Sequence, residues 1–401
     1  MTEQIGAALR LLYPDGRAIT PDSATDDFSL KSLCENNVYS LTLTPRRAGL
    51  ALAAVEYDIP LPHALTDVPE ELYIYDDSAH TNDFTSVVPY VGNETRTVYN
   101  LAVFKNLRTR KMFLCGLLTA HRFLAMFNLH DGLVTLRFDL EERELHAGEA
   151  YLLERFMVAE GTDNENVLLE AYGDAVSACN GARPDKPLPV GWCSWSCYYG
   201  NVNEEKIRRA ADGQATYTRA GESNLIQIDD GWQRCGSFCG KWVPDDTKFP
   251  SGLEATGQYV RDRGMTFGLW LAPWLLDDRS DYYGELKHLA REEATLGEHY
   301  HPFELGDPRY LAHLSATFRE MTERYGARYF KLDFLAAAIR FFNWRGDFIR
   351  FRDGFRVEAL RGALQTIRDA VGPDAFLLLC GAPTLIGAGI TDGSRTSADI
   401  I

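Results

Sequence analysis

A change of hydrophobic pattern near Pro189 constrains this chain more than any other sequence feature. After Pro189, short and almost continuously apolar segments such as 225–228 (LIQI), 329–332 (YFKL) and 376–379 (FLLL) alternate with segments of helical periodicity. Strands that are apolar on both faces and separated by helices are typical of parallel β/α construction. We therefore predict a parallel β/α domain over residues 190–401.

The number of predicted strands indicates which β/α architecture this domain has. Six strands can be recognised after Pro189. A complete eight-stranded (β/α) barrel takes about 250 residues, and the residues from Pro189 onward fall short of that length. The sequence therefore predicts a TIM-type barrel that is incomplete, with about six of its eight strands, in a chain truncated at its C-terminus.

The residues before Pro189 follow a different pattern. Segments such as 39–44 (YSLTLT), 97–104 (TVYNLAVF) and 133–140 (LVTLRFDL) are rich in β-branched and aromatic residues or alternate polar with apolar residues. Short strands separated by turns predict an antiparallel β-sandwich over residues 1–160. Residues 161–189 combine a helical pattern with the proline-rich stretch GARPDKPLP and are predicted to form a helical connection and linker.

Charge and hydropathy exclude several classes of partner. The formal net charge is −16 at pH 7, and an acidic surface repels nucleic acid and anionic membranes. The sequence has no apolar run of the roughly 20 residues that a membrane-spanning helix needs, and no signal peptide is evident at its start. The eight cysteines are too sparse for a disulfide scaffold, so we expect reduced thiols and a cytoplasmic protein.

Two cysteine pairs with a spacing of four residues raise the question of a metal site. They are Cys193 with Cys197 and Cys235 with Cys239. A structural zinc site generally has tighter ligand spacing and further ligands. We therefore expect no metal and no cofactor.

Polar and aromatic residues follow the predicted strands at the point where each strand ends. In strand order these residues are Trp195, the pair Asp229 and Asp230, Trp270, the pair Lys331 and Asp333, Cys380, and the pair Arg395 and Asp399. Because the carboxyl ends of barrel strands meet at one rim, we expect these side chains to converge. Carboxylates at such a rim are costly to desolvate unless partners compensate, so their repetition favours a functional site.

Each of these positions also has a simpler structural interpretation. The alternatives are a turn at Asp229-Asp230-Gly231, a local ion pair of Lys331 with Asp333, a core position for Cys380 and a helical surface pair of Arg395 with Asp399. A shared functional rim is the stronger interpretation, because otherwise four unrelated structural features would have to occur at the same rim by chance.

Tryptophans indicate the kind of ligand. All seven tryptophans lie after residue 191, and Trp195, Trp232 and Trp270 lie close to strand ends or to the acidic pair. Aromatic faces beside carboxylates suit a sugar ring, which has apolar faces and polar edges. Two carboxylates across a rim are what cleavage of a glycosidic bond requires. We expect Lys331 to keep Asp333 ionised, as a nucleophile must be.

Six motifs in a fixed order carry a family resemblance. GWCSW, QIDDGW, GLWLAP, YFKLDF, LLLCGAP and DGSRTSAD resemble the alpha-galactosidases of glycoside hydrolase family 36, the melibiase-like group. The resemblance extends strongly over residues 150–401 and only in general character over the predicted sandwich. It implies a retaining hydrolase that releases terminal alpha-linked galactose from oligosaccharides through a covalent galactosyl-enzyme, with its two carboxyl groups about 5–5.5 Å apart.

The resemblance also implies a role for each residue at the rim. Asp333 would be the nucleophile and Asp399 the acid/base, facing each other across one hollow. Galactose hydroxyls at O4 and O6 would be held by Asp229 and Asp230. The remaining implied substrate-binding residues are Trp195, Trp270, Lys331, Cys380 and Arg395. Homo-oligomers are common in the group, so a homo-oligomer is compatible with the resemblance.

Three other functions stay open at this stage. The first is a non-catalytic galactose-binding fragment, and the second is a relative that acts on alpha-N-acetylgalactosamine or transfers galactose to another sugar. The third is a metal-dependent hydrolase with Asp229, Asp230 and Asp333 as oxygen ligands. The third lacks the histidines that are usual in such sites, because no histidine lies at a predicted strand end.

Overall fold

The structure is a computed structural model of the 401-residue chain. It describes residues 9–21, 26–76, 85–90, 92, 94–182, 186–217, 219, 222–291, 297–339, 350–352 and 354–395. The chain divides into two compact units, which are described one at a time. Unit 1 comprises Met1–Ala79, Asp83–Ala182 and Phe355–Glu358, and unit 2 comprises His80–Asn82, Arg183–Gly354 and Ala359–Ile401.

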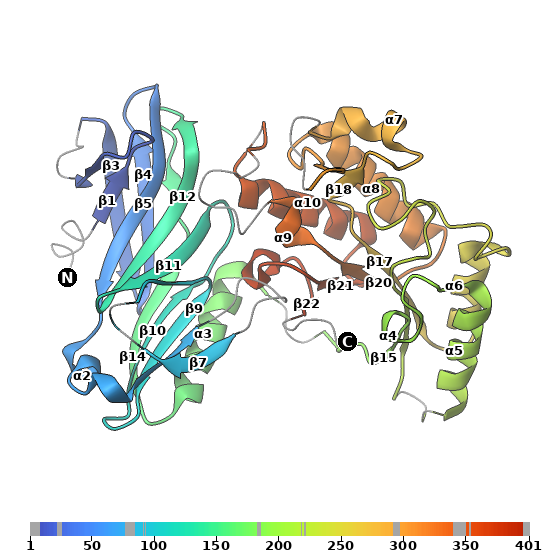
Figure 1. Cartoon of the computed structure of the whole chain (residues 1–401), viewed down its shortest axis with the longest axis horizontal. Helices are drawn as coiled ribbons and strands as arrows, with labels where there is room; N and C mark the ends of the chain where they lie inside the picture. Colours follow the sequence, from blue (N-terminus) through green and yellow to red (C-terminus); the bar gives the residue numbers. More distant parts are fainter. Residues whose placement is uncertain are drawn as a thin grey trace. The chain divides into compact units, whose positions relative to one another are not determined.

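Unit 1 contains two antiparallel sheets (Figure 1). In the first, six strands follow the order β2-β1-β5-β12-β11-β8. Their bounds are β1 (Leu9–Leu12), β2 (Ala18–Ile19), β5 (Leu50–Pro60), β8 (Arg96–Val98), β11 (Leu124–His130) and β12 (Leu133–Leu145). The long strands β5 and β12 form the centre of this sheet and pair with each other.

The second sheet of unit 1 has eight described strands. Seven follow the order β13-β4-β14-β10-β9-β6-β7, and β3 pairs with β4. Their bounds are β3 (Phe28–Glu35), β4 (Val38–Pro45), β6 (Leu72–Asp76), β7 (Ser86–Pro89), β9 (Leu101–Asn106), β10 (Lys111–Leu117), β13 (Tyr151–Leu152) and β14 (Phe156–Thr162). The predicted antiparallel sandwich is therefore confirmed.

One predicted strand of unit 1 is wrong in its extent. The segment 97–104 was expected to form a single strand, but it is divided between β8 and β9. β8 pairs with β11 in the first sheet, whereas β9 pairs with β6 and β10 in the second. The chain changes sheet at this point, and alternation of residue types does not show which sheet a strand joins.

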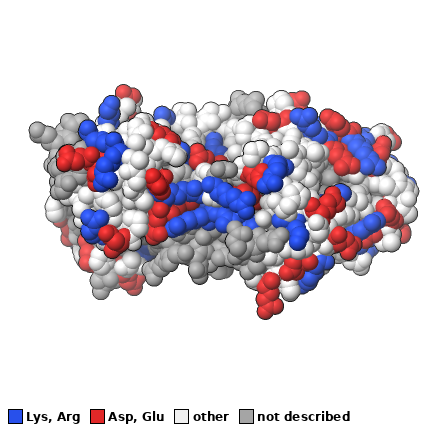
Figure 2. Space-filling view, turned by 90° about the horizontal axis from the view of Figure 1, so that it is seen from above, with Lys and Arg blue, Asp and Glu red and all other residues white. Residues whose placement is uncertain are grey.

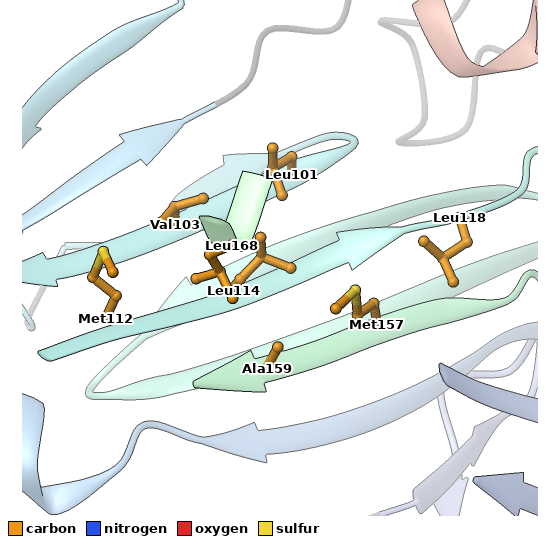
Figure 3. Packing of buried hydrophobic residues seen from close by; sticks show 8 residues of the cluster. All are labelled: Leu101, Val103, Met112, Leu114, Leu118, Met157, Ala159 and Leu168. Carbon is orange, nitrogen blue, oxygen red and sulfur yellow. The ribbon is translucent and has the colours of Figure 1, made fainter. Parts of the chain in front are cut away.

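A long helix covers part of the second sheet. Short helical turns α2 (His63–Thr66) and η3 (Pro69–Glu71) precede β6, and α3 (Glu165–Asn180) follows β14. Asn164 caps α3 by accepting a hydrogen bond from the backbone N–H of Asn166, and Gly181 ends the helix with a left-handed conformation. Leu168 of α3 is buried, which contributes about 1.5–3 kcal/mol. Figure 3 shows it packed with Leu101, Val103, Met112, Leu114, Leu118, Met157 and Ala159.

Unit 2 is built around a parallel sheet. Its six described strands follow the order of the chain, β15-β16-β17-β20-β21-β22. Their bounds are β15 (Gly191–Cys193), β16 (Leu225–Ile228), β17 (Thr266–Leu271), β20 (Tyr329–Leu332), β21 (Phe376–Leu379) and β22 (Gly393–Ser394). All four residues of β16 and of β20 are buried, as expected for strands covered on both faces. The sheet is curled into a half-barrel, which confirms the incomplete barrel of six strands (Figure 1).

Helices and a small hairpin connect the strands of this sheet. Their bounds are α4 (Trp195–Tyr198), α5 (Glu204–Tyr217), α6 (Gly252–Arg261), β18 (Leu275–Asp277), α7 (Tyr283–Leu286), η4 (Lys287–Leu289), β19 (Tyr300–Pro302), α8 (Pro308–Glu323), α9 (Leu335–Ala338), α10 (Arg356–Val371) and η5 (Thr384–Gly387). Asp307 accepts a hydrogen bond from the backbone N–H of Arg309, and Pro308 occupies the first helical position of α8. The Asp-Pro pair thus begins a helix where the sequence predicts one.

The surface of the molecule carries charges of both signs. Figure 2 shows Lys and Arg intermixed with Asp and Glu on the face in view, so the negative net charge does not gather there as one acidic patch. Within the described residues, no helix is both long enough and apolar enough to cross a membrane.

Candidate active site

The register of the parallel sheet of unit 2 places several of the predicted residues at one edge. Trp270 of β17 lies opposite Lys331 of β20, and Lys331 in turn lies opposite Leu378 of β21. Ile228, the last residue of β16, lies opposite Leu269 of β17. Because parallel strands in register end together, the residues that follow them share the carboxyl edge of the sheet. Asp229, Asp333 and Cys380 follow β16, β20 and β21 directly.

Asp229 is the most heavily hydrogen-bonded carboxylate at this edge. It is 2% exposed. Its Oδ2 accepts hydrogen bonds from Lys331 Nζ at 2.9 Å and Gln227 Nε2 at 2.6 Å, and from the Cys193 thiol at 3.3 Å. Its Oδ1 accepts the backbone N–H of Asp230 at 3.0 Å. A buried charge requires partners of this kind, so Asp229 is held as one member of a compensated pair.

Lys331 is the cationic member of this pair. It is 7% exposed and forms its ion pair with Asp229, not the local pair with Asp333 that the sequence left open. Burial alone would lower the pKa of Lys331, but the negative charges of Asp229 and Asp333 outweigh burial and raise it. Lys331 is therefore a charged group at neutral pH, held against the carboxylate of Asp229.

Asp230 is held by a different set of contacts. Its side chain is half-buried, with Oδ1 accepting a hydrogen bond from Gln233 Nε2 at 2.6 Å and Oδ2 accepting one from the Ser237 hydroxyl. Both donors belong to the loop that follows Asp230 in the chain. The carboxylate therefore has a fixed orientation while part of its surface remains accessible.

Asp333 is oriented by three N–H groups. Its Oδ2 accepts a hydrogen bond from Trp270 Nε1 at 3.0 Å, and its Oδ1 accepts the backbone N–H of Phe334 at 2.8 Å. Trp274 Nε1 donates to the backbone carbonyl of Asp333 at 2.7 Å. Phe334 has φ of 60°, a left-handed conformation that is rare for a bulky residue.

The segment that follows β21 lies close to the Asp333 side chain. A Cβ atom on Gly381 would lie 3.0 Å from Asp333 Oδ1, and Gly381 has φ of 59°. Only glycine fits this position without strain. Cys380 is fully buried, and burial followed by the charge of Asp333 raises the pKa of its thiol. Cys380 is thus a neutral thiol beside the carboxylate.

The two predicted aromatic residues differ in exposure. Trp270 is 2% exposed and packs edge-on against Trp242 and Phe334, so it acts on Asp333 mainly through its N–H group. Trp195 is half-buried at the start of α4, and its ring lies 5.3 Å from that of Tyr199. Of the two, Trp195 has more ring surface available to a ligand.

The last pair of predicted residues is described only in part. Arg395 follows β22, and its backbone N–H donates to Leu379 O at 2.9 Å. This bond places Arg395 beside the end of β21. Asp399 lies outside the described residues.

Several residues at this edge were missed by the sequence analysis. They are Cys193, Ser194, Gln227, Gln233, Ser237, Trp274 and Gly381. Gln227 carried a signal, because it is the one polar residue within the apolar run LIQI. Ser194 Oγ accepts the backbone N–H of Asp229 at 2.8 Å, a contact across 35 residues that no local pattern reveals.

The cysteine pairs have separate partners. Cys193 donates to Asp229, Cys235 donates to Asp281 Oδ2 at 3.0 Å, and Cys239 donates to Lys241 O at 3.2 Å. All eight cysteines are free thiols. In the described part of the chain, no group of three or more His, Cys, Asp or Glu residues is arranged to hold a metal ion.

Comparison with known proteins matches the part of this edge that extends as far as Asp333. Residues 176–334 match the Melibiase family model. This stretch, less than half of the chain, is similar to a Melibiase domain. The chain is 28% identical to alpha-galactosidase AgaA of Geobacillus stearothermophilus over 145 aligned residues. The aligned region covers 35% of this chain and 19% of AgaA. The resemblance that the six motifs indicated is thus confirmed.

Solved structures share the fold. The alpha-galactosidase TtGalA of Thermus thermophilus, in complex with p-nitrophenyl alpha-D-galactopyranoside, matches with a TM-score of 0.64 at 22% identity over 92% of this chain and 74% of that chain. The same enzyme has been solved in complex with stachyose. The family 36 structure of AgaA matches with a TM-score of 0.69 at 14% identity over 97% of this chain and 64% of that chain. The chain therefore spans about two thirds of the length of these structures.

Proposed function

We propose that this protein is a retaining alpha-galactosidase that releases terminal alpha-linked galactose from oligosaccharides. The observation that carries the proposal is the carboxylate of Asp333, which follows β20 in the stretch similar to a Melibiase domain and is oriented by Trp270 and Phe334. A nucleophile must be held at a fixed angle toward the carbon that it attacks, and two N–H donors on separate oxygens provide this.

The proposed reaction has two steps. In the first, an oxygen of Asp333 attacks the anomeric carbon and the bond to the leaving oxygen breaks, while Asp399 donates a proton to that oxygen. In the second, Asp399 takes a proton from water, the water oxygen attacks the anomeric carbon, and the ester to Asp333 breaks. Galactose leaves with its anomeric configuration retained, and both carboxyl groups return to their starting states.

The remaining residues would bind the sugar. We assign the galactose hydroxyls to Asp229, Asp230 and Lys331. Trp195 and Trp270 would border the ring, and Cys380 and Arg395 would line the pocket. The substrates that we propose are alpha-galactoside oligosaccharides, the class to which the stachyose bound by TtGalA belongs.

We also propose a cytoplasmic location, since all eight cysteines are free thiols. Fractionation of cells that produce the protein tests this. Recovery of the protein outside the cytoplasm would contradict the assignment.

A panel of p-nitrophenyl glycosides tests the function. We expect release of nitrophenol from the alpha-galactoside and little release from the alpha-N-acetylgalactosaminide or the alpha-glucoside. A 2-deoxy-2-fluoro-galactoside should label Asp333, as detected by mass spectrometry of proteolytic peptides. Stable galactose binding without turnover would support the non-catalytic alternative, and labelling of another residue would overturn the assignment of Asp333.

A further inference from the structure

The loop that follows Asp230 holds both oxygens of its carboxylate. Gln233 Nε2 donates to Oδ1 at 2.6 Å, and the Ser237 hydroxyl donates to Oδ2. One contact would leave the side chain free to rotate about Cβ–Cγ, whereas two donors on different oxygens fix the plane of the carboxylate.

The orientation of the Gln233 amide is itself determined. Its Oε1 accepts the backbone N–H of Gly231 at 3.1 Å, and its Nε2 donates to Gly236 O at 3.0 Å in addition to Asp230. A rotated amide would set the carbonyl against two acceptors and the NH2 group against a donor. Gln233 is 3% exposed, so water does not replace these partners. The side chain can therefore present only its NH2 group to Asp230.

The loop has a rigid frame. Gly231 has φ of 110°, and a Cβ atom on it would lie 2.5 Å from Gly200 O. The chain then turns at Cys235 and Gly236, both in the left-handed region, which returns Ser237 to Asp230. The base of the loop is held by hydrogen bonds from Arg234 N to Val243 O at 2.8 Å and from Asp245 N to Trp232 O at 3.0 Å.

Asp230 also differs from Asp229 in what it can offer a ligand. Oδ2 of Asp229 already accepts three donors, and the side chain is buried. Each oxygen of Asp230 has one described protein donor here and the side chain is half-buried. A carboxylate oxygen has about two lone-pair positions, so Asp230 retains acceptor capacity for hydroxyl groups.

We propose that Gln233 and Ser237 are positioning residues that set the direction of the free lone pairs of Asp230 and thereby select the configuration of a sugar hydroxyl. The inference rests on the proposed function, in which Asp230 accepts hydroxyl groups of galactose. Galactose and glucose differ only in the configuration at C4, and a fixed acceptor discriminates between axial and equatorial hydroxyls where a rotating one does not.

Three variants test this role. Ser237→Ala removes one donor, and Gln233→Glu keeps an acceptor for Gly231 but places a carboxylate oxygen against Asp230. We expect each to raise KM for p-nitrophenyl alpha-galactoside and Kd for galactose about 10-fold, with kcat changed less than about 3-fold. The ratio of kcat/KM for galactoside over glucoside should fall by a similar factor. Ser237→Thr keeps a hydroxyl group and should restore both values.

Arg234→Ala is the matched control. Arg234 lies in the same loop, but its exposed side chain pairs with Asp246 and not with Asp230. It should leave KM, Kd and the sugar preference within about 2-fold of wild type. Thermal unfolding of all four variants shows whether each is folded, and galactose binding measured by calorimetry gives a readout that does not depend on turnover.

The outcomes separate the two proposals. A wild-type protein that hydrolyses the galactoside, together with folded Ser237→Ala and Gln233→Glu proteins that match it in Kd and sugar preference, overturns the positioning role alone. A loss of kcat at unchanged KM also overturns it, because the role concerns binding. A wild-type protein that neither binds galactose nor hydrolyses galactosides overturns the proposed function and this inference with it.

Discussion

Unit 1 and unit 2 both bury charged side chains, but each does so in a different place. In unit 1 the carboxylate of Glu154 is 2% exposed and accepts hydrogen bonds from the Thr119 hydroxyl and from the backbone N–H groups of His121, Arg122 and Phe123. The carboxylate thus accepts the hydrogen bonds of the backbone N–H groups in a turn. In unit 2 the buried charges of Asp229 and Lys331 lie beside each other at the carboxyl edge of the sheet, whereas others, such as Glu304 and Arg368, pair elsewhere.

A second example in unit 1 has the same character. Arg356 begins α10 within the segment Phe355–Glu358, which belongs to unit 1 although the rest of the helix belongs to unit 2. It is fully buried and pairs with Asp139 and Glu141, where β12 departs from regular pairing. Glu141 and the next residue, Glu142, both have positive φ. These buried charges are therefore paired with one another at an irregular part of a strand.

The difference follows from strand direction. Neighbouring antiparallel strands end at opposite edges of a sheet, so the polar residues that follow them are dispersed. Neighbouring parallel strands end at the same edge, which concentrates such residues. The buried charges described in the antiparallel unit therefore concern stability, whereas the Asp229–Lys331 pair at the carboxyl edge of the parallel sheet is a candidate for chemistry.

Asp333→Asn should give the largest effect on activity. The amide keeps the shape of the side chain but cannot act as a nucleophile, so we expect kcat to fall roughly 1000-fold or more while the melting temperature changes little. Steady-state kinetics and thermal unfolding of the same preparation measure both. Retention of wild-type kcat would place the chemistry elsewhere.

Glu154→Ala should show the opposite behaviour. It leaves three backbone N–H groups of a buried turn without their acceptor, and we expect a loss of about 3 kcal/mol in the free energy of unfolding. The folded fraction should keep kcat and KM. Glu160→Ala is the control in the same unit, because Glu160 is exposed and its loss should cost less than about 0.5 kcal/mol. A fall in kcat for Glu154→Ala would break the contrast between the units.

Two glycines with similar backbone conformations sharpen the comparison. Gly381 in unit 2 and Gly132 in unit 1 have φ of 59° and 73°, so alanine should cost each about 1–2 kcal/mol in stability. A Cβ atom at Gly132 would meet nothing within 4 Å, whereas at Gly381 it would press on Asp333 Oδ1. We therefore expect kcat to fall about 10-fold in Gly381→Ala only. Equal kcat values in the two variants would contradict the crowding at Asp333.

The reactivity of the Cys193 thiol tests the electrostatics at the carboxyl edge of unit 2 without any substitution. Burial, followed by the charge of Asp229, raises the pKa of Cys193 to about 12. At pH 8 its thiolate fraction is then about 1 in 10,000, so iodoacetamide should label exposed Cys197 well before Cys193. The rate for Cys193 should rise as pH approaches 12 and should equal that of Cys197 in urea. Equal labelling of the native protein at pH 8 would show that Cys193 is not held beside Asp229 in this way.

Strand order and the location of the edge could be predicted because they follow from local pattern and chain direction. The run LIQI before Asp229 and the run YFKL before Asp333 are apolar throughout, which indicates strands covered on both faces. Once the strands are parallel, geometry requires the residues after them to meet. The single strand predicted over 97–104 was wrong in its extent, because the sheet that a strand joins depends on partners far away in the sequence.

The sequence by itself determined that Asp229, Asp333 and Cys380 follow strands directly, since strand ends are set by hydrophobic runs. Only the tertiary structure decided which of them contact one another. Lys331 pairs with Asp229, which lies 102 residues away, although Asp333 is two residues from it in the chain. Asp333 lies beyond the end of β20, where strand alternation no longer sets the direction of a side chain. The partner of Lys331 comes instead from the end of β16, two strands away in the sheet, and is not set by proximity in sequence.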